Sequence, residues 1–102
     1  MISIVQYGSD TCMPCGALET KLGAWVKDHE GIECSYVSVE AEPAKAAQQS
    51  IFTVPAIVVY VDGKEVMRRA GYFSLDELLD QVEAIKDQNR RVIKAGEPLR
   101  SV

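Results

Sequence analysis

The apolar residues of the chain recur with two periods, and each period predicts a different kind of element. Residues 1–7 form an apolar, β-branched run, which predicts a strand buried on both faces, as in the centre of a covered sheet. Residues 16–29 show helical spacing, with one apolar stripe made of Leu18, Leu22, Trp25 and Val26. Residues 32–39 return to alternation and predict a second strand.

The second half of the chain continues this alternation of strands and helices. A short helix is predicted over residues 44–50, and an apolar run over 56–61 predicts another buried strand. Asp62-Gly63 is a strong signal for a two-residue hairpin turn, so residues 64–69 should pair back on that strand. A last helix follows a capping-box serine and has the apolar stripe Leu75, Leu78, Leu79, Val82 and Ile85. The predicted order is β-α-β-α-β-β-α.

The helical pattern weakens after Ile85. A polar, mostly basic stretch follows, and two helix breakers, Gly96 and Pro98, come near the end. A chain of 102 residues has the length of one domain. We therefore expect a single domain over 1–102, in which 86–102 is a C-terminal helical extension or tail.

Composition and charge exclude several classes of partner. Apolar residues make up 47% of the chain and charged residues 25%, which is typical of a globular domain with a modest core. The formal net charge of −4 argues against nucleic acid, whose phosphates need clustered lysine and arginine. No stretch approaches the ~20 apolar residues needed to cross a bilayer. The N-terminus enters a strand without a secretory leader pattern, so we expect no membrane partner and a cytoplasmic location.

Candidate chemistry is concentrated at Cys12-Met13-Pro14-Cys15, between the first predicted strand and the first predicted helix. Two cysteines three residues apart at a helix start lie about one turn from each other, close enough for a disulfide. The first cysteine meets unpaired backbone N–H groups and the positive end of the helix dipole, which stabilise the nucleophilic thiolate. Pro14 fits the first turn, where its missing N–H is not needed. This context predicts a thiol–disulfide exchange site.

A zinc site is the main alternative for the same cysteines. The candidate ligands are Cys12, Cys15, His29 and Cys34, but His29 falls at the far end of a helix, ~20 Å from Cys15 at 1.5 Å per residue. We therefore expect no metal. Cys34 is interpreted as a small buried core residue, and His29 as a solvated helix end. Trp25 is interpreted as a core side chain on the helical stripe.

The order of elements and four short motifs resemble the thioredoxin superfamily over nearly the whole chain. The motifs are Cys12-Met13-Pro14-Cys15, Thr53-Val54-Pro55, Asp62-Gly63-Lys64 and Gly71-Tyr72-Phe73-Ser74. The chain looks like the minimal core of the fold, without the first strand and helix of full thioredoxins. The resemblance implies an α/β thioredoxin-like fold, with a central mixed four-stranded sheet and helices on both faces.

The resemblance also implies what the site residues do. In a dithiol–disulfide oxidoreductase of this kind, Cys12 attacks a disulfide and Cys15 resolves the mixed disulfide. Pro55 is expected to be cis and to face the cysteines, while the backbone of Thr53 and Val54 pairs with an extended substrate. The other substrate-binding or structural residues expected at the site are Pro14, Met13, Thr11 and Gly71.

The same resemblance bears on cofactors and partners. No metal or organic cofactor is needed, because the dithiol carries the electrons. The expected partners are disulfide-containing protein substrates and a reductase that supplies electrons. We expect a monomer and leave a dimer open.

Three positions depart from the usual thioredoxin pattern. Thr11 stands where tryptophan is usual, Met13 where glycine is usual, and Gln6 replaces a buried aspartate that relays a proton for the second thiol. Gln6 is therefore expected to slow the resolving step. No lysine, arginine or histidine adjoins the cysteines, which favours a reductase over a strong oxidant. Two other functions stay open: a glutaredoxin-like, glutathione-linked reductase, and a thioredoxin-fold binding module without redox turnover.

Overall fold

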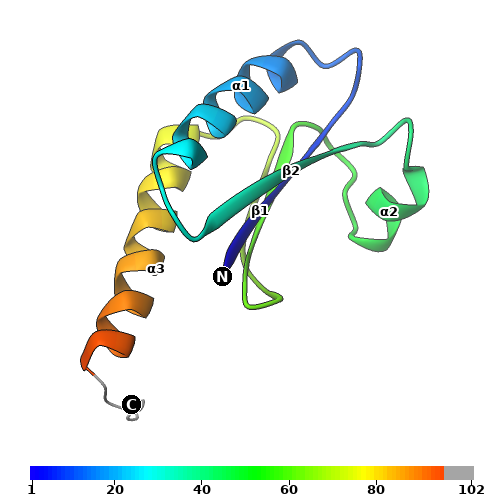
Figure 1. Ribbon diagram of the computed structural model, residues 1–102. Helices are drawn as coiled ribbons and strands as arrows, with labels where there is room; N and C mark the ends of the chain where they lie inside the picture. Colours follow the sequence, from blue (N-terminus) through cyan, green and yellow to red (C-terminus); the bar gives the residue numbers. More distant parts are fainter. Residues whose placement is uncertain (96–102) are drawn as a thin grey trace.

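The observed elements follow the predicted order. The computed structural model describes residues 1–95, and its chain runs β-α-β-α-β-β-α (Figure 1). The elements are β1 (Ile2–Gly8), α1 (Met13–Lys27), β2 (Ile32–Ser38), α2 (Pro43–Gln48), β3 (Ala56–Val61), β4 (Lys64–Ala70) and α3 (Leu75–Ala95).

β1 lies inside the sheet, as its apolar side chains on both faces require. The strand order is β2-β1-β3-β4, with β1 parallel to β2 and antiparallel to β3. β4 pairs antiparallel with the other side of β3. Ile4 on one face of β1 and Tyr7 on the other are both buried. The predicted mixed four-stranded sheet is therefore confirmed.

Two apolar clusters assign the helices to opposite faces of this sheet. The larger cluster packs Ile57 of β3 against Leu22 of α1 and Leu78 of α3. The smaller cluster joins Tyr7 of β1 to Ala46 of α2. Helices α1 and α3 therefore cover one face and α2 covers the other (Figure 1). Both predicted helical stripes point into the larger cluster.

The hairpin between β3 and β4 has the predicted turn. Asp62 and Gly63 both have positive φ values, 52° and 86°. Two consecutive positive φ values define the type I′ turn, whose twist matches that of paired strands. The hairpin returns the chain so that Ala70 pairs with Ala56. The residue after β4 therefore lies beside the residue before β3.

The prediction that Cys34 is a buried core residue is wrong. Cys34 is an exposed free cysteine near the middle of β2. β2 is an edge strand, and in it only Ile32 and Val37 are buried. One flank of an edge strand stays open to solvent, so alternation along the chain does not guarantee burial.

α3 extends farther than the apolar pattern indicates. The helix runs to Ala95, so the polar stretch after Ile85 does not end it. Over residues 75–88, the part of the helix whose side chains the structure describes, the buried ones are Leu75, Leu78, Leu79 and Val82. The second half projects away from the sheet (Figure 1). The rest of the predicted extension, residues 96–102, lies outside the described residues.

The prediction that His29 is a solvated helix end is also wrong. Its side chain is only 18% exposed. The ring stacks on Trp25 at a centroid distance of 3.7 Å. Nδ1 lies 2.7 Å from the Trp25 carbonyl oxygen, and Nε2 lies 3.0 Å from the Glu83 carboxylate. Trp25 itself packs partly buried against the larger cluster, as predicted. His29 therefore links the end of α1 to α3 through its contacts with Trp25 and Glu83.

We predict that the contacts of His29 with Trp25 and Glu83 stabilise the protein more in weak acid than in base. Both ring nitrogens of His29 face acceptors, and only the imidazolium donates from both. The Trp25 carbonyl first, and then Glu83, raise the pKa of His29. Its stabilisation is complete below the ordinary histidine pKa of ~6.5 and is lost as pH rises through the raised folded-state pKa.

The measurement is the free energy of unfolding in urea at pH 5.5 and pH 8.5. His29→Gln should lower it more at pH 5.5 than at pH 8.5. Asp80→Asn, at an exposed carboxylate of α3, serves as the control and should not show this pH dependence. An equal loss for His29→Gln at both pH values would contradict the prediction.

Candidate active site

The first cysteine of the motif sits at the junction between a loop and α1. Cys12 is the N-cap residue, with extended backbone angles of φ −90° and ψ 105°, and α1 begins at Met13. Pro14 occupies the first helical turn, where it removes no intrahelical hydrogen bond. The first turn contains no acidic residue that would oppose a thiolate. The sulfur of Cys12 therefore lies at the positive end of the helix dipole.

The two cysteines are joined in a disulfide and differ strongly in burial. Their Cα atoms are 5.4 Å apart. Cys12 is half-buried, whereas Cys15 is only 1% exposed. A partner sulfur can therefore reach Cys12 from solvent, but it cannot reach Cys15 without displacing protein.

Glu40 fixes the loop that precedes Cys12. One of its carboxylate oxygens accepts the Ser9 hydroxyl at 2.8 Å, and the other accepts the Asp10 backbone N–H at 2.9 Å. The Asp10 N–H first, and then the Ser9 hydroxyl, lower the pKa of Glu40. Ser9 Oγ in turn accepts the Thr11 backbone N–H at 3.2 Å. Glu40 was not predicted to belong to the site, because a carboxylate near a strand end carries no distinctive pattern.

Gln6 supports the buried side of the motif. Its side chain is 1% exposed, and its Nε2 donates to the Cys15 carbonyl oxygen at 2.9 Å. Its Oε1 has no hydrogen-bond partner among the described residues. Gln6, which stands where thioredoxins usually have an aspartate, therefore contacts Cys15 through an uncharged amide.

A second loop faces the cysteines from the sheet. The Val54–Pro55 peptide bond is cis, as the resemblance implied. Gly71, with a φ of 78°, donates its backbone N–H to the Pro55 carbonyl at 3.0 Å. Within the described residues, the backbone N–H and C=O groups of Thr53 and Val54 have no hydrogen-bond partner. This short segment is therefore a free edge beside Cys12.

These segments enclose a groove of about 640 Å³. Eight of the nine predicted site residues line it, namely Thr11, Cys12, Met13, Pro14, Thr53, Val54, Pro55 and Gly71. Cys15, the ninth, lies buried beneath it. Three lining residues were not predicted to belong to the site: Leu18, Tyr72 and Phe73. Tyr72 and Phe73 directly follow Gly71, so their place in the motif Gly71-Tyr72-Phe73-Ser74 could have identified them as site residues.

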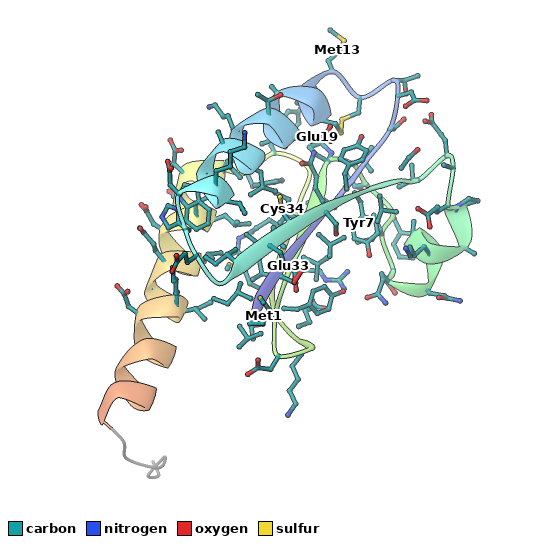
Figure 2. The ribbon with its side chains drawn as sticks, viewed as in Figure 1. Met1, Tyr7, Met13, Glu19, Glu33 and Cys34 are labelled. Atoms are coloured by element: carbon teal, nitrogen blue, oxygen red, sulfur yellow. A yellow bond between two sulfur atoms is a disulfide. The ribbon has the colours of Figure 1, made fainter. Side chains whose placement is uncertain are left out.

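The groove is apolar and its rim projects into solvent. None of its lining residues, all within the described part of the chain, carries a charge. Met13 is 90% exposed and points away from the end of α1 (Figure 2). Tyr72 is fully exposed on the opposite loop. Large apolar side chains this exposed mark a contact surface for a partner.

No metal centre competes with this arrangement in the part of the chain that the structure describes. There, no three His, Cys, Asp or Glu side chains are grouped closely enough to hold a metal ion. Of the four candidate zinc ligands, Cys12 and Cys15 are joined to each other, Cys34 lies exposed on β2, and His29 binds Trp25 and Glu83.

Comparison with known proteins gives this fold and site a family. The family model described as Thioredoxin matches residues 1–84. The chain belongs to the thioredoxin family. It is 28% identical to the thioredoxin of Chlamydia trachomatis over 76 residues, which cover 74% of each chain. It is 26% identical to a thioredoxin of Staphylococcus aureus over 84 residues, which cover 78% of this chain and 81% of the relative.

Solved thioredoxin structures superpose on the same region. Thioredoxin 1 of Thermosipho africanus has a TM-score of 0.81 and 26% identity, with 86% of this chain and 98% of that chain covered. The thioredoxin of Fasciola hepatica has a TM-score of 0.74 and 28% identity, with coverages of 81% and 79%. The predicted family and fold class are therefore confirmed.

Membership in the thioredoxin family fixes the class of chemistry. With the Cys12–Cys15 pair in place, the chain is a thiol–disulfide oxidoreductase. The thioredoxin family implies protein disulfides as the general class of substrate and a reductase as the general class of partner. No helix within residues 1–95 has the length and apolar character needed to cross a bilayer.

Cys34, the third cysteine, lies outside the groove and has a different environment. Partial burial of its sulfur, and then the negative charge of Glu19, raise the pKa of the Cys34 thiol. A raised pKa lowers the fraction of reactive thiolate near neutral pH. Cys34 is therefore exposed but poorly activated, whereas Cys12 has the helix N-terminus to stabilise its thiolate.

We predict that iodoacetamide alkylates Cys12 faster than Cys34 in the reduced protein at pH 7.5. Glu19→Gln should speed alkylation of Cys34, because removing the negative charge lowers the thiol pKa. Glu33→Gln is the matched control, since successive strand residues face opposite sides of a sheet and Glu33 adjoins Cys34 in β2. Mass spectrometry of time points measures both rates. A Cys34 rate equal to that of Cys12 would contradict this ranking.

Proposed function

We propose that the protein reduces disulfides in protein substrates, with Cys12 as the attacking thiol and Cys15 as the resolving thiol. The Cys12 thiolate attacks one sulfur of the substrate disulfide, and the other substrate sulfur leaves as a thiolate that takes up a proton. The Cys15 thiolate then attacks Cys12 and releases the first substrate sulfur. The substrate gains two electrons and two protons, and the protein is left with the Cys12–Cys15 disulfide.

The difference in burial between the two cysteines carries this assignment of roles. Cys12 opens on the groove, and Cys15 is 1% exposed one helical turn further on. The exposed thiol is available to a bulky substrate, and the buried thiol is available only to Cys12. The disulfide between them supports the second step, because both sulfurs already lie within bonding reach.

The free backbone of Thr53 and Val54 supports an extended substrate. Unpaired N–H and C=O groups beside a reactive centre can pair with an added strand. Such pairing recognises the backbone of a protein segment and not a particular side chain. Pro55, Gly71, Met13, Pro14 and Thr11 then shape the groove around the segment.

The direction of reaction is proposed as reduction. Among the residues that the structure describes, no cationic side chain lines the groove to stabilise the Cys12 thiolate further, which supports a reductase and not a strong oxidant. A separate reductase then regenerates the dithiol, and neither a metal nor an organic cofactor takes part. We further propose a cytoplasmic protein, a monomer with a dimer left open, in which residues 1–102 form one domain and 86–102 are its C-terminal helical extension or tail.

The trapping of mixed disulfides tests this function and both roles. Cys15→Ser should accumulate a covalent complex with a disulfide-containing protein such as insulin, because the second step is lost. Cys12→Ser should accumulate little, because Cys15 is buried and the exposed Cys34 thiol is poorly activated. Non-reducing electrophoresis measures both. Cys34→Ser, with the motif intact, is the control and should turn over without trapping; equal trapping by the first two variants would sink the assignment.

Gln6 provides a second test, of the resolving step. Gln6→Asp should speed single-turnover reduction of a disulfide at pH 7, because a buried carboxylate can take the proton from Cys15. General bases typically contribute about 10²–10⁴-fold, so the increase should fall at or below the lower value for a substituted site. Burial raises the pKa of a carboxyl group, so the gain should grow as pH rises through that value.

Gln6→Asn separates base catalysis from a change of shape. The asparagine side chain matches aspartate in size but cannot accept the proton at neutral pH. Stopped-flow measurements from pH 6 to pH 9 should show the gain for Gln6→Asp alone. The same rate profile for both variants would contradict a proton-transfer role at this position.

A further inference from the structure

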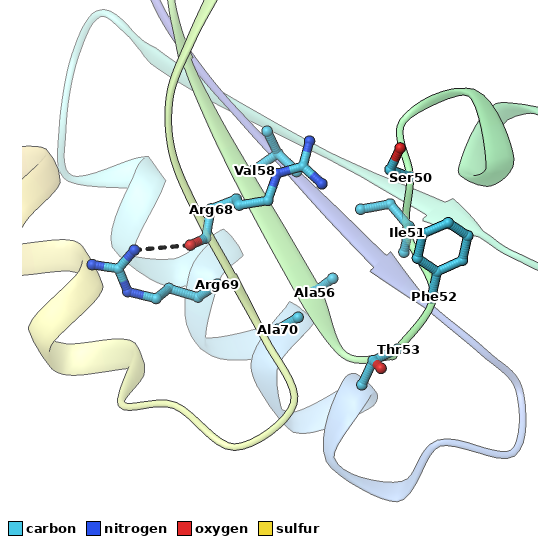
Figure 3. A pocket seen from close by; sticks show the side chains of 9 residues that line it. All are labelled: Ser50, Ile51, Phe52, Thr53, Ala56, Val58, Arg68, Arg69 and Ala70. Atoms are coloured by element: carbon cyan, nitrogen blue, oxygen red, sulfur yellow. Dashed lines mark hydrogen bonds between the residues drawn. The ribbon is translucent and has the colours of Figure 1, made fainter.

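A second cavity lies beside the active-site groove, on the sheet face that α2 covers. Its volume is about 180 Å³, and Ala56 and Val58 of β3 and Ala70 of β4 are among its lining residues (Figure 3). Ile51 borders it from the loop after α2. Phe52 stands at its rim with 86% of its surface exposed. The short side chains of Ala56, Val58 and Ala70 give the cavity an apolar wall.

The cavity and the groove are neighbours, separated by a single ridge. Thr53 lines both of them. Ala70 lines the cavity, and the next residue, Gly71, lines the groove. The methyl group of Thr53 lies 3.8 Å from the position of a Cβ on Gly71, so these two residues meet across the ridge. An extended segment that pairs with Thr53 therefore passes from the groove to the cavity within two residues, about 7 Å.

Two arginines line the cavity, but Arg68 is paired with a carboxylate and Arg69 is directed away from it. Arg68 forms two hydrogen bonds to the Glu65 carboxylate, at 2.7 and 2.8 Å, and a third to the Gln49 carbonyl at 3.0 Å. Arg69 points away from the other lining side chains and donates to the Arg68 carbonyl and to Gln81 of α3 (Figure 3). The cavity therefore favours an uncharged guest.

The size of the cavity limits what it can hold. Sites for small-molecule ligands usually measure about 300–1,000 Å³. A volume of about 180 Å³ is too small for such a ligand but suits one side chain. Phe52 provides further apolar surface at the entrance, where it has little contact of its own.

We propose that this cavity is a second subsite, which takes one uncharged apolar side chain of the protein segment whose disulfide Cys12 attacks. The side chain belongs to the residue two positions from the attacked cysteine, since alternate residues of a strand face the same side. The inference rests on the proposed function and deepens it. Such a subsite makes the enzyme prefer disulfides in which an apolar residue lies two positions from the attacked cysteine.

The test uses three peptides in which cysteine is joined by a disulfide to a coloured nitrothiobenzoate leaving group. Their sequences are Leu-Ser-Cys-Ser-Leu, Ala-Ser-Cys-Ser-Ala and Asp-Ser-Cys-Ser-Asp, flanked by the same residues, so either strand direction is covered. Release of the coloured thiol by an excess of reduced protein gives the second-order rate constant of the reaction with each peptide. The leucine peptide should exceed the alanine peptide by about tenfold, as expected when a small apolar pocket gains methylene groups.

Variants assign the preference to the cavity and not to the groove. Ala70→Leu fills the cavity from an exposed position and should bring the leucine-to-alanine ratio close to one. Phe52→Ser removes the rim and should lower the ratio in part. Val66→Leu makes the same kind of enlargement on β4 at a residue that does not line the cavity, so it should leave the ratio unchanged.

The outcomes distinguish failure of the subsite from failure of the proposed disulfide-reductase function. Loss of the leucine preference in Ala70→Leu, with the preference intact in Val66→Leu, supports the subsite. Equal rates for the leucine and alanine peptides, a preference that survives Ala70→Leu, or a preference for the aspartate peptide would overturn it. If the wild type also fails to reduce a small disulfide such as hydroxyethyl disulfide, the proposed function itself fails.

Discussion

The active site depends on the register between three strands. Tyr7 at the end of β1 pairs with Ala56 at the start of β3, and Ala56 pairs with Ala70 at the end of β4. These pairs bring three loops to one edge of the sheet: the loop that leads to Cys12, the loop that contains Pro55, and the loop that begins at Gly71. A one-residue slip of β3 against β1 would turn every β3 side chain to the wrong face. The same hydrogen bonds that hold the core therefore also align the groove.

Most of the fold and the groove could be predicted because their signals are local. Apolar periodicity placed the strands and helices, and the Asp62-Gly63 turn fixed how β4 returns. The motif at Cys12 and the triplet ending at Pro55 located two walls of the groove. Gly71 located the third, because a glycine that breaks a strand marks a sharp change of direction, here with a φ of 78°.

The errors arose where burial depends on neighbours that are distant in the sequence. Cys34 alternates like a core residue, but β2 has a strand on only one side. His29 lies near a helix end, but α3 packs beside it and supplies Glu83. Glu40 was missed for the same reason, since it acts on a loop about thirty residues earlier in the chain. Periodicity in one segment cannot show which other segment will cover it.

The contact between Glu40 and the loop bears on how this site responds to acid. Hydrogen bonds from Asp10 and Ser9 keep the Glu40 pKa below its ordinary value, so its carboxylate stays ionised well into the acid range. Acid that would neutralise an ordinary carboxylate therefore leaves this contact in place. The loop that carries Cys12 keeps its two hydrogen bonds to Glu40 over that range, so weak acid does not change the shape of the approach to the nucleophile.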